Sequence, residues 1–373
     1  MRDFSHVHRI VVKVGTNLLS SADGIDEACV DTITGQIAAL KERGHQVILV
    51  SSGAIGMGAK ELRLKGKVKQ VKMRQACAAI GQPLLMSAWR HSFKKHGFLC
   101  SQVLLTRRDL NNRLTYVNLR NSVTTLLELG VVPIFNENDT VSIAEIGTAF
   151  GDNDRMSAMV ASKIDADLLI ILTDIEGLYT ADPKRDPSAR LLNEVETLDD
   201  QVLSYAGDAG STHATGGMKT KLLAAKIAAN AGCGTIIASG YEQNSLLRLL
   251  DGEALGTYIH PDRRMSQRQR WILNNSHLGS IEIDGGAKEA ILKKKSLLPS
   301  GVVRVNGIFA EGDVVQVYAT GEKPFAKAAV YLNSTEISKV AGHPSRDVST
   351  ILGSGHKTMI FRPEDVVLIG ESK

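Results

Sequence analysis

The sequence predicts an α/β protein, a three-layer sandwich with a mainly parallel sheet, followed by a small β-rich domain. From Arg9 to about His260, short and continuously apolar runs alternate with amphipathic helical patterns. This alternation is typical of parallel strands that helices cover on both faces. Beyond this point the apolar runs are shorter and turn residues separate them. Since 373 residues fit two or three domains, we expect domains at 1–260 and 277–373, joined by a linker at 261–276.

The first strand and helix show how the pattern works. Ile10–Val14 is a short apolar run, and apolar residues then recur at three- and four-residue spacing from Ile25 to Leu40. Gly44 follows as a left-handed helix cap. The same alternation predicts these further elements: strands at 47–50, 98–105, 131–135, 168–172 and 235–238, and helices at 116–129, 154–163 and 218–231.

The C-terminal part has the pattern of a small β-rich domain with one or two helices. It is preceded by the basic segment 263–270, which we interpret as a linker or an exposed helix. Turn signals at 284–286 and 311–313 divide the runs that follow. The expected strands lie at 280–283, 302–305, 314–318, 328–332 and 366–369, and the expected helices near 287–294 and 334–340.

Composition argues against several classes of protein. Lys and Arg number 44 against 40 Asp and Glu, and a net charge of +4 is too small to indicate a nucleic-acid or membrane partner. We expect no membrane segment and no secretory signal, because no apolar stretch is long enough to cross a bilayer and the N-terminus lacks a continuous apolar core. Cys29, Cys77, Cys100 and Cys233 form no C-x-x-C pair, which fits thiols in a cytoplasmic protein.

Small, polar and charged residues follow the predicted strands of the first domain. In an open parallel sheet, ligands bind outside the carboxyl ends of the strands. These positions therefore form a candidate site, although loops are polar in any protein. The residues concerned are Lys13, Gly15, Thr16 and Asn17 at the first strand, Ser51, Ser52 and Gly53 at the second, Asn136 to Asp139 at the fourth, and Thr173 and Asp174 at the fifth.

Glycine residues that would suit an anion occur at three places. Gly15 and the run Gly53-x-x-Gly56-x-Gly58 would let backbone N–H groups approach a phosphate, but glycine-rich turns are common. The usual P-loop and dinucleotide fingerprints are absent from these segments. The segment 207–221, GDAGSTHATGGMKTK, is more specific. It either bends around phosphate oxygens, with Lys219 or Lys221 beside them, or is a surface loop with solvated lysines.

The run Asp152-Asn153-Asp154 opens a predicted helix and has three interpretations. It could cap the helix, form a solvated acidic turn, or hold cationic groups. An acid cluster beside lysines makes sense for phosphoryl transfer, because a carboxylate between two lysines limits their mutual repulsion. We treat His213 as structural or incidental.

Six motifs in order together resemble the glutamate 5-kinase family, which has the amino acid kinase fold. They cover nearly all of residues 9–260, and the later segments 286–307 and 341–343 resemble the PUA domain of many members. The motifs are VVKVGTN (11–17), SSGAIGMG (51–58), FNENDTV (135–141), GDNDRMSA (151–158), LTDIEGLYTADP (172–183) and TGGMKTK (215–221). Phe135, Arg155 and Met156 depart from the usual family pattern, which concerns fine specificity only.

The resemblance implies phosphorylation of the L-glutamate γ-carboxylate by ATP with Mg²⁺ carried on the nucleotide, the first step toward proline. The implied catalytic residues are Lys13, Lys221 and Asp154. The implied glutamate-binding residues are Ser52, Asp139 and Asn153, with Asn136 and Asp152 beside them. The implied ATP-binding residues are Lys13, Thr173, Asp174, Thr215, Gly216, Gly217, Met218, Lys219, Thr220 and Lys221, with the backbone of Gly15 and Gly53 at the phosphates.

Further expectations concern partners and competing functions. The resemblance implies inhibition by proline, a symmetric homo-oligomer, and handover of the product to glutamyl-phosphate reductase. We expect the segment 207–217 to close over the site, because acyl phosphates hydrolyse readily. One alternative is another carboxylate, carbamate or nucleotide kinase of the same fold. Another is RNA binding by the PUA domain, which we do not expect because the basic runs are typical of solvated surface and aromatics are only 5% of the chain.

Overall fold

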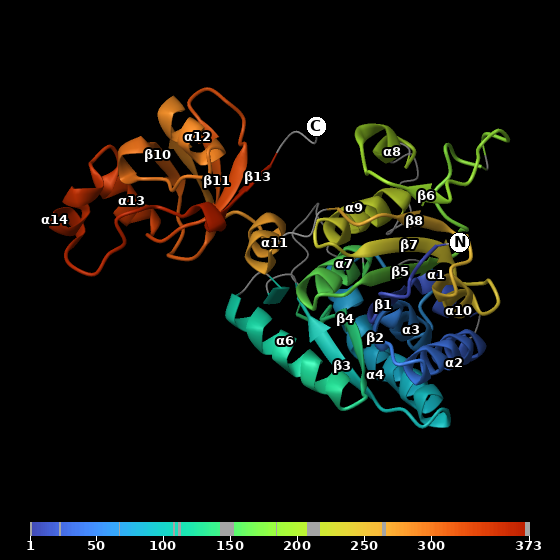
Figure 1. The fold of residues 1–373 in the computed structure, drawn as a ribbon. Helices are drawn as coiled ribbons and strands as arrows, with labels where there is room; N and C mark the ends of the chain where they lie inside the picture. Colours follow the sequence, from blue (N-terminus) through green and yellow to red (C-terminus); the bar gives the residue numbers. More distant parts are fainter. Residues whose placement is uncertain are drawn as a thin grey trace. The chain divides into compact units, whose positions relative to one another are not determined.

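The computed structural model describes residues 2–21, 24–66, 68–106, 109–110, 113–141, 153–183, 185–206, 217–262 and 266–369. The chain divides into two compact units, Met1–Arg264 and Met265–Lys373 (Figure 1). We describe each unit by itself.

The described part of the first unit contains a sheet of eight strands in the order β3-β4-β2-β1-β5-β7-β8-β6. Neighbouring strands are parallel except β7 and β8, which are antiparallel. The predicted mainly parallel sheet is therefore confirmed. The strands are β1 (Arg9–Val14), β2 (Gln46–Ser51), β3 (Cys100–Leu105), β4 (Val132–Glu137), β5 (Leu168–Thr173), β6 (Glu194–Val195), β7 (Gly234–Ser239) and β8 (Thr257–Ile259).

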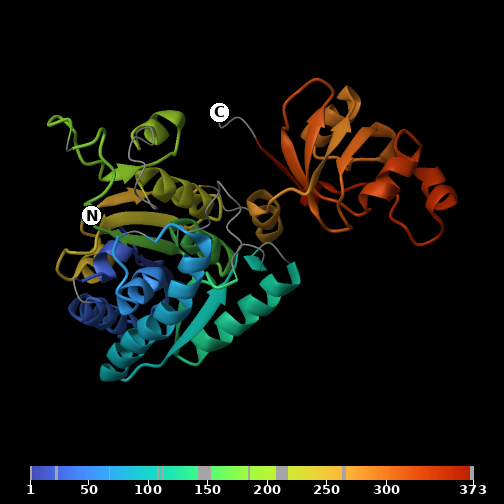
Figure 2. The same cartoon turned by 180° about the vertical axis from the view of Figure 1, so that it is seen from behind.

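Helices cover both faces of this sheet (Figures 1 and 2). Because side chains alternate along a strand, Ile10, Val12 and Val14 pack with α2, α4 and α10, whereas Val11 packs with the core that includes α6, α7 and α9. Lys13 therefore faces the same side as Val11. The helices are α1 (Thr16–Leu19), α2 (Glu27–Glu42), α3 (Ala54–Glu61), α4 (Val71–Lys95), α6 (Arg113–Glu128), α7 (Asn153–Lys163), α8 (Asp200–Ser204), α9 (Met218–Ala229) and α10 (Ser245–Leu250).

Two glycines allow α3 and α4 to approach closely. A Cβ atom on Gly58 would lie 1.8 Å from the carbonyl oxygen of Cys77, and one on Gly81 would lie 1.8 Å from that of Ala54. Gly53 has φ +110° and caps the start of α3. The glycine run at 53–58 thus has two uses, because Gly58 serves helix packing and only its first members lie toward the strand ends.

The second unit is built on a five-stranded sheet with the order β10-β9-β11-β12-β13 among its described residues. The predicted β-rich character is confirmed, but more helices are present than the one or two expected between the strands. The strands are β9 (Gly279–Ile283), β10 (Val302–Gly307), β11 (Val314–Ala319), β12 (Ala326–Ala329) and β13 (Val366–Leu368), and the helices are α11 (Gln267–Asn274), α12 (Gly285–Leu292), α13 (Ser334–Val340) and α14 (Val348–Leu352).

Helix α11 lies in the segment that we interpreted as a linker or an exposed helix. Ser266 and Gln269 form a reciprocal capping box at its start. Ile272 is fully buried in a cluster with residues of the second sheet, and Arg268 forms an ion pair with the buried Asp365. The helix is therefore packed into the second unit.

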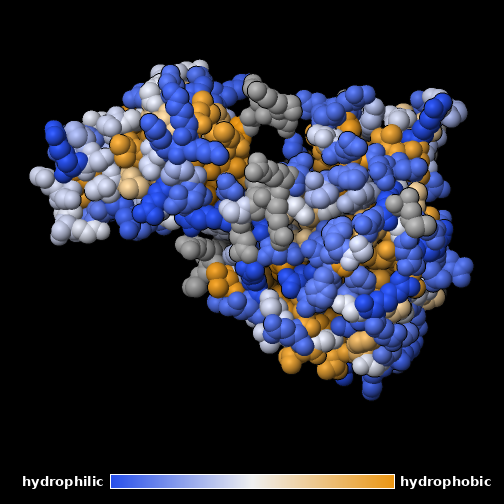
Figure 3. All heavy atoms as spheres, in the orientation of Figure 1, coloured by the Kyte–Doolittle hydropathy of each residue, from blue (hydrophilic) through white to orange (hydrophobic). Residues whose placement is uncertain are grey.

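Among the described residues, no helix combines the length and apolar character that crossing a membrane requires. The face drawn in Figure 3 is mostly hydrophilic, with scattered apolar patches.

The two glycines of α3 provide a matched stability test. Gly58→Ala should lower the free energy of unfolding by about 2 kcal/mol or more, because its methyl group would overlap the Cys77 carbonyl. Gly56→Ala should be neutral or stabilise by up to about 1 kcal/mol, because no atom lies within 4 Å of its Cβ position. Urea unfolding of both variants measures this, and equal stabilities would contradict the close helix contact.

Candidate active site

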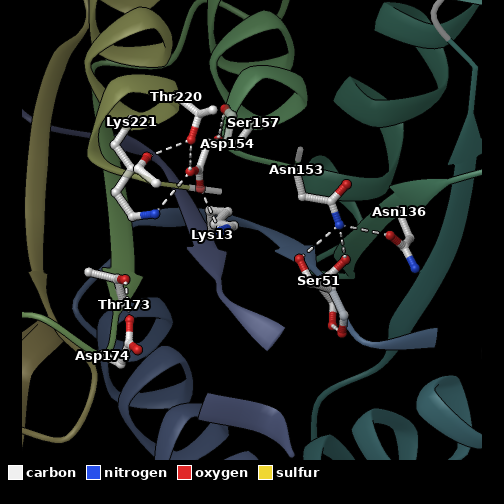
Figure 4. Close-up of polar contacts among 12 residues, drawn as sticks. Lys13, Ser51, Asn136, Asn153, Asp154, Ser157, Thr173, Asp174, Thr220 and Lys221 are labelled. Carbon is white, nitrogen blue, oxygen red and sulfur yellow. Dashed lines mark hydrogen bonds and ion pairs between the residues drawn. The ribbon is translucent and has the colours of Figure 1, made fainter. Parts of the chain in front are cut away.

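The candidate site forms where four parallel strands end. Lys13 lies in β1, Ser51 and Ser52 at the end of β2, Asn136 in β4 and Thr173 at the end of β5. The first turns of α7 and α9 add Asn153, Asp154, Thr220 and Lys221 (Figure 4). This is the edge of the sheet that the sequence predicted, because the carboxyl ends of adjacent parallel strands meet there.

A buried carboxylate joins two lysines in this site. The Nζ of Lys13 lies 2.5 Å from Oδ1 of Asp154, and the Nζ of Lys221 lies 3.1 Å from its Oδ2. The hydroxyl of Thr220 also donates to Oδ2, at 3.1 Å. Asp154 has no exposed surface, and the two lysines are 6% and 4% exposed. We call these three charged residues the lysine–aspartate triad.

Electrostatics keep the Asp154 carboxyl ionised inside the protein. Burial by itself would raise its pKa, but the positive charges of Lys13 and Lys221 and their hydrogen bonds outweigh it, so the pKa lies below its ordinary value. The triad carries a net charge of +1, because two ammonium groups share one carboxylate. The arrangement therefore suits the binding of an anion.

Asn153, the residue before Asp154, anchors a second cluster that is neutral. Its Nδ2 group, which has two hydrogens to donate, lies 2.9 Å from each of three acceptors, the Ser51 carbonyl, the Ser52 hydroxyl and Asn136 Oδ1. The Ser51 hydroxyl in turn accepts from Trp89 Nε1 at 2.9 Å. Consecutive residues at the start of α7 thus hold the charged cluster and the neutral cluster side by side (Figure 4).

A cavity of about 700 Å³ opens beside the neutral cluster. Its lining includes four of the residues that the resemblance assigned to glutamate: Ser52, Asn136, Asp139 and Asn153. Arg74 lines the same cavity. Burial raises the pKa of Asp139, and the positive charge of Arg74 only partly offsets this effect.

The remaining predicted residues that the structure describes lie around the triad. Thr173 donates to Asp174 at 3.0 Å, and Asn17 donates to the other oxygen of Asp174 at 2.9 Å. The Gly15 amide donates to the Leu172 carbonyl at 3.2 Å, so this N–H is used within the protein. Gly217, Met218 and Lys219 begin α9, and Lys219 is exposed whereas Lys221 is buried. Of the two lysines considered for the phosphate, Lys221 is thus the one that reaches Asp154.

Part of the predicted site lies outside the described residues. Asp152, Thr215 and Gly216 are among these positions, as are His213 and most of the expected closing segment 207–217. Their assignments stay predictions.

Sequence reasoning missed several residues of this region. Arg74 and Gln82 come from α4, a helix that the periodicity did not predict, and Trp89 from the same helix contacts Ser51. Asn17 was noted only as a polar loop residue, and its contact with Asp174 was not expected. No local pattern marks these residues, because their place in the site depends on what their side chains contact.

Comparisons with known proteins define the class of this chain. Residues 8–239 match the model of the amino acid kinase family, and residues 279–352 match that of the PUA domain. The first match covers more than half of the chain, so the chain belongs to the amino acid kinase family and carries a PUA domain.

Curated relatives define the branch of that family. The chain is 43% identical to the glutamate 5-kinase of Methanosarcina mazei, with 99% of this chain and 98% of the relative covered. It is 44% identical to those of Methanosarcina barkeri, with 96% of each covered, and Azoarcus sp., with 99% of this chain and 100% of the relative covered. The chain is therefore a member of the glutamate 5-kinase family.

Replacing Asp154 should expose the energetic role of the triad. Asp154→Asn should lower the free energy of unfolding at pH 7 by about 3 kcal/mol, because two buried ammonium groups lose their counterion. A lowered carboxyl pKa stabilises the folded state above the unfolded value of about 3.9, and this contribution is lost as the pH falls through the folded pKa. The difference between the two proteins should thus be constant above about pH 5 and shrink below about pH 4.

Urea unfolding between about pH 2.5 and 7 measures this difference. Asp251→Asn, at an exposed pair with Arg43, is the matched control and should change stability by about 0.5 kcal/mol or less. A difference for Asp154→Asn that widens on acidification would contradict the assignment.

Proposed function

We propose that this chain transfers the γ-phosphoryl group of ATP to the γ-carboxylate of L-glutamate. The relatives that carry the name glutamate 5-kinase support this reaction. The observation that carries it is the start of α7. There Asn153 belongs to the neutral cluster and lines the cavity, and the next residue, Asp154, contacts the two lysines. A phosphoryl acceptor in the cavity and a phosphoryl donor at the lysines would therefore meet at one turn of helix.

The reaction needs charge stabilisation more than it needs a base. A carboxylate with an ordinary pKa near 4.3 is already ionised at neutral pH, so no group has to remove a proton from it. The obstacle is the repulsion between this anion and the polyphosphate, and the charge that spreads over the migrating group. Lys13 and Lys221 would neutralise that charge, while Asp154 holds both ammonium groups at fixed positions.

We assign the magnesium ion to the nucleotide. Mg²⁺ prefers oxygen ligands and commonly binds through substrate phosphates and water. The two oxygens of Asp154 already contact the lysines, so the phosphate oxygens of ATP are the expected ligands. The ion would reduce the negative charge on the phosphates.

The amino-acid end of glutamate would bind inside the cavity. Its ammonium group requires an acceptor or an anion, and its α-carboxylate requires a cation. Asp139 and Arg74 line the cavity and supply one group of each kind. This pairing favours a zwitterionic substrate over a simple dicarboxylate.

Three finer proposals follow from family membership. We propose that proline inhibits by occupying the same cavity, because it presents an ammonium and a carboxylate to the same two residues. We also propose a symmetric homo-oligomer and delivery of the labile product to glutamyl-phosphate reductase. Competition between proline and glutamate, and the mass of the protein in solution, address the first two.

The substrate is tested with ATP, hydroxylamine and a panel of acceptors. Glutamate should give a hydroxamate and release ADP, because hydroxylamine traps the acyl phosphate. Aspartate, N-acetylglutamate and UMP should each give at least about tenfold less ADP, since none presents the same carboxylate and ammonium at the same spacing. Preference for any of these over glutamate would overturn the proposal.

Two lysine variants control this assay. Lys221→Ala should lower kcat by about 10³-fold, because it removes a cation from the migrating group. Lys226→Ala changes an exposed lysine of the same helix and should leave kcat within about twofold of the unaltered enzyme. Similar losses in both variants would mean that the helix, not the ammonium group, was responsible.

Asp139 should control the affinity for glutamate. Asp139→Asn should raise the KM for glutamate about 10- to 100-fold and leave the KM for ATP unchanged, because the ammonium group loses a charged acceptor. Steady-state kinetics with each substrate varied in turn measure this, with Asp251→Asn as the control. An unchanged KM for glutamate would remove Asp139 from the binding site.

A further inference from the structure

A dense run of positive charge connects α3 and α4. Residues 60–74 contain seven lysines and arginines against one acid, Glu61, so this segment has an excess of six positive charges. The whole chain has an excess of only four, and the remainder of the chain is therefore slightly negative. We call residues 60–74 the basic segment.

Part of the basic segment lines the cavity of about 700 Å³. Three of its cations do so: Lys60, Lys69 and Arg74. Lys65 is exposed and has a lining residue on either side of it in the sequence. Among the described residues, no acid forms an ion pair with any of these four cations. Their charge is therefore not neutralised by a contacting carboxylate.

The backbone fixes the basic segment where the cavity meets solvent. At the end of α3, the Arg63 amide donates to the Lys60 carbonyl at 2.8 Å and the Leu64 amide to the Ala59 carbonyl at 2.9 Å. Arg63 has φ +53°, so it closes the helix in the left-handed conformation of a C-terminal cap. The Lys60 ammonium also donates to the Gly24 carbonyl at 3.3 Å. The cations on this turn are thus held beside the cavity.

The charges that line the cavity match those of free glutamate. The three cations lie opposite two carboxylates, Glu137 and Asp139, which leaves a formal charge of +1. Burial raises the pKa of Asp139, so the positive excess is not diminished. Glutamate has one ammonium and two carboxylates and carries a net charge of −1 at neutral pH. The lining therefore attracts this amino acid before any specific contact forms.

We propose that the basic segment is an electrostatic entrance, whose exposed lysines attract the anionic amino acid into the cavity. A single exposed charge contributes little to binding. Several charges of one sign around a cavity add, and together they raise the local concentration of an anion. Lys65 and Lys69 would act through their charge and not through a defined contact. This inference rests on the proposed function, because it concerns the same substrate.

The test is a series of double variants of the full-length protein that differ in charge. Lys65→Gln with Lys69→Gln removes two charges and should lower kcat/KM for glutamate about threefold, with kcat within about twofold. Lys65→Glu with Lys69→Glu changes the charge by four and should lower kcat/KM about tenfold. Lys65→Arg with Lys69→Arg keeps the charge and should leave kcat/KM unchanged.

Ionic strength separates a charge effect from altered packing. Between about 0.03 and 0.5 M, the Debye length falls from roughly 18 Å to roughly 4 Å. The difference between the unaltered protein and the charge-reversed variant should therefore shrink from about tenfold to about twofold. Lys94→Gln is the control, because this exposed lysine lies 20 residues after Arg74 in α4, or about 30 Å along the helix. It should not change kcat/KM at either ionic strength.

Two results would overturn the proposal. One is a loss of kcat/KM that persists undiminished at high ionic strength, which would assign the lysines a structural role. The other is a kcat/KM that does not depend on the charge at positions 65 and 69. An unaltered protein that forms no hydroxamate from glutamate would instead refute the proposed function.

Discussion

The candidate site depends on the contact between Asp154 and its two lysines. Burying one carboxylate without exposed surface is costly, and so is burying two ammonium groups. Together they are tolerable, because each lysine offsets the desolvation of the acid and the acid separates charges that would otherwise repel. At an effective dielectric of about 20, two unit charges 4 Å apart interact by about 4 kcal/mol. The surplus positive charge remains available, so the structure retains an anion-binding capacity that a neutral pair would not provide.

The fold brings these three residues together from distant parts of the chain. Lys13 reaches the triad because its position in β1 alternates with the buried Val12 and Val14, which puts it on the face covered by α7 and α9. Asp154 and Lys221 lie in the first turns of those two helices. A shift of one residue in β1 would turn Lys13 to the opposite face. The register between β1 and its neighbours β2 and β5 is therefore as important to the site as the identity of the lysine.

Much of the first unit could be predicted because its strands are buried on both faces and are apolar without interruption. The strand-end rule also located Ser52, Asn136 and Thr173 correctly at one edge. Helix α4 could not be predicted, because Gly81 and Gln82 interrupt the apolar residues of its buried face and the exposed Pro83 lies inside the helix. Gly81 is favourable only in contact with α3, and Gln82 only beside Asn136. Such residues are favourable because of the residues they contact, and no local pattern identifies contacts that are distant in sequence. The assignment of roles came from the family motifs and not from spacing.

The two halves of the site place different demands on geometry. An ammonium group attracts an anion from many directions, so the triad tolerates small displacements of a phosphate. A side-chain amide presents a donor on one side and an acceptor on the other, so a half-turn exchanges attraction for repulsion. Precision is therefore needed mainly around Asn153 and Asn136, where main-chain groups hold both amides in place. A fold alone does not determine function. A protein of this architecture could therefore keep the lysine–aspartate triad for the phosphoryl donor and bind a different phosphoryl acceptor if the neutral cluster were altered. The choice of phosphoryl acceptor would then depend on the residues that line the cavity, including the neutral cluster and the charged Asp139 and Arg74.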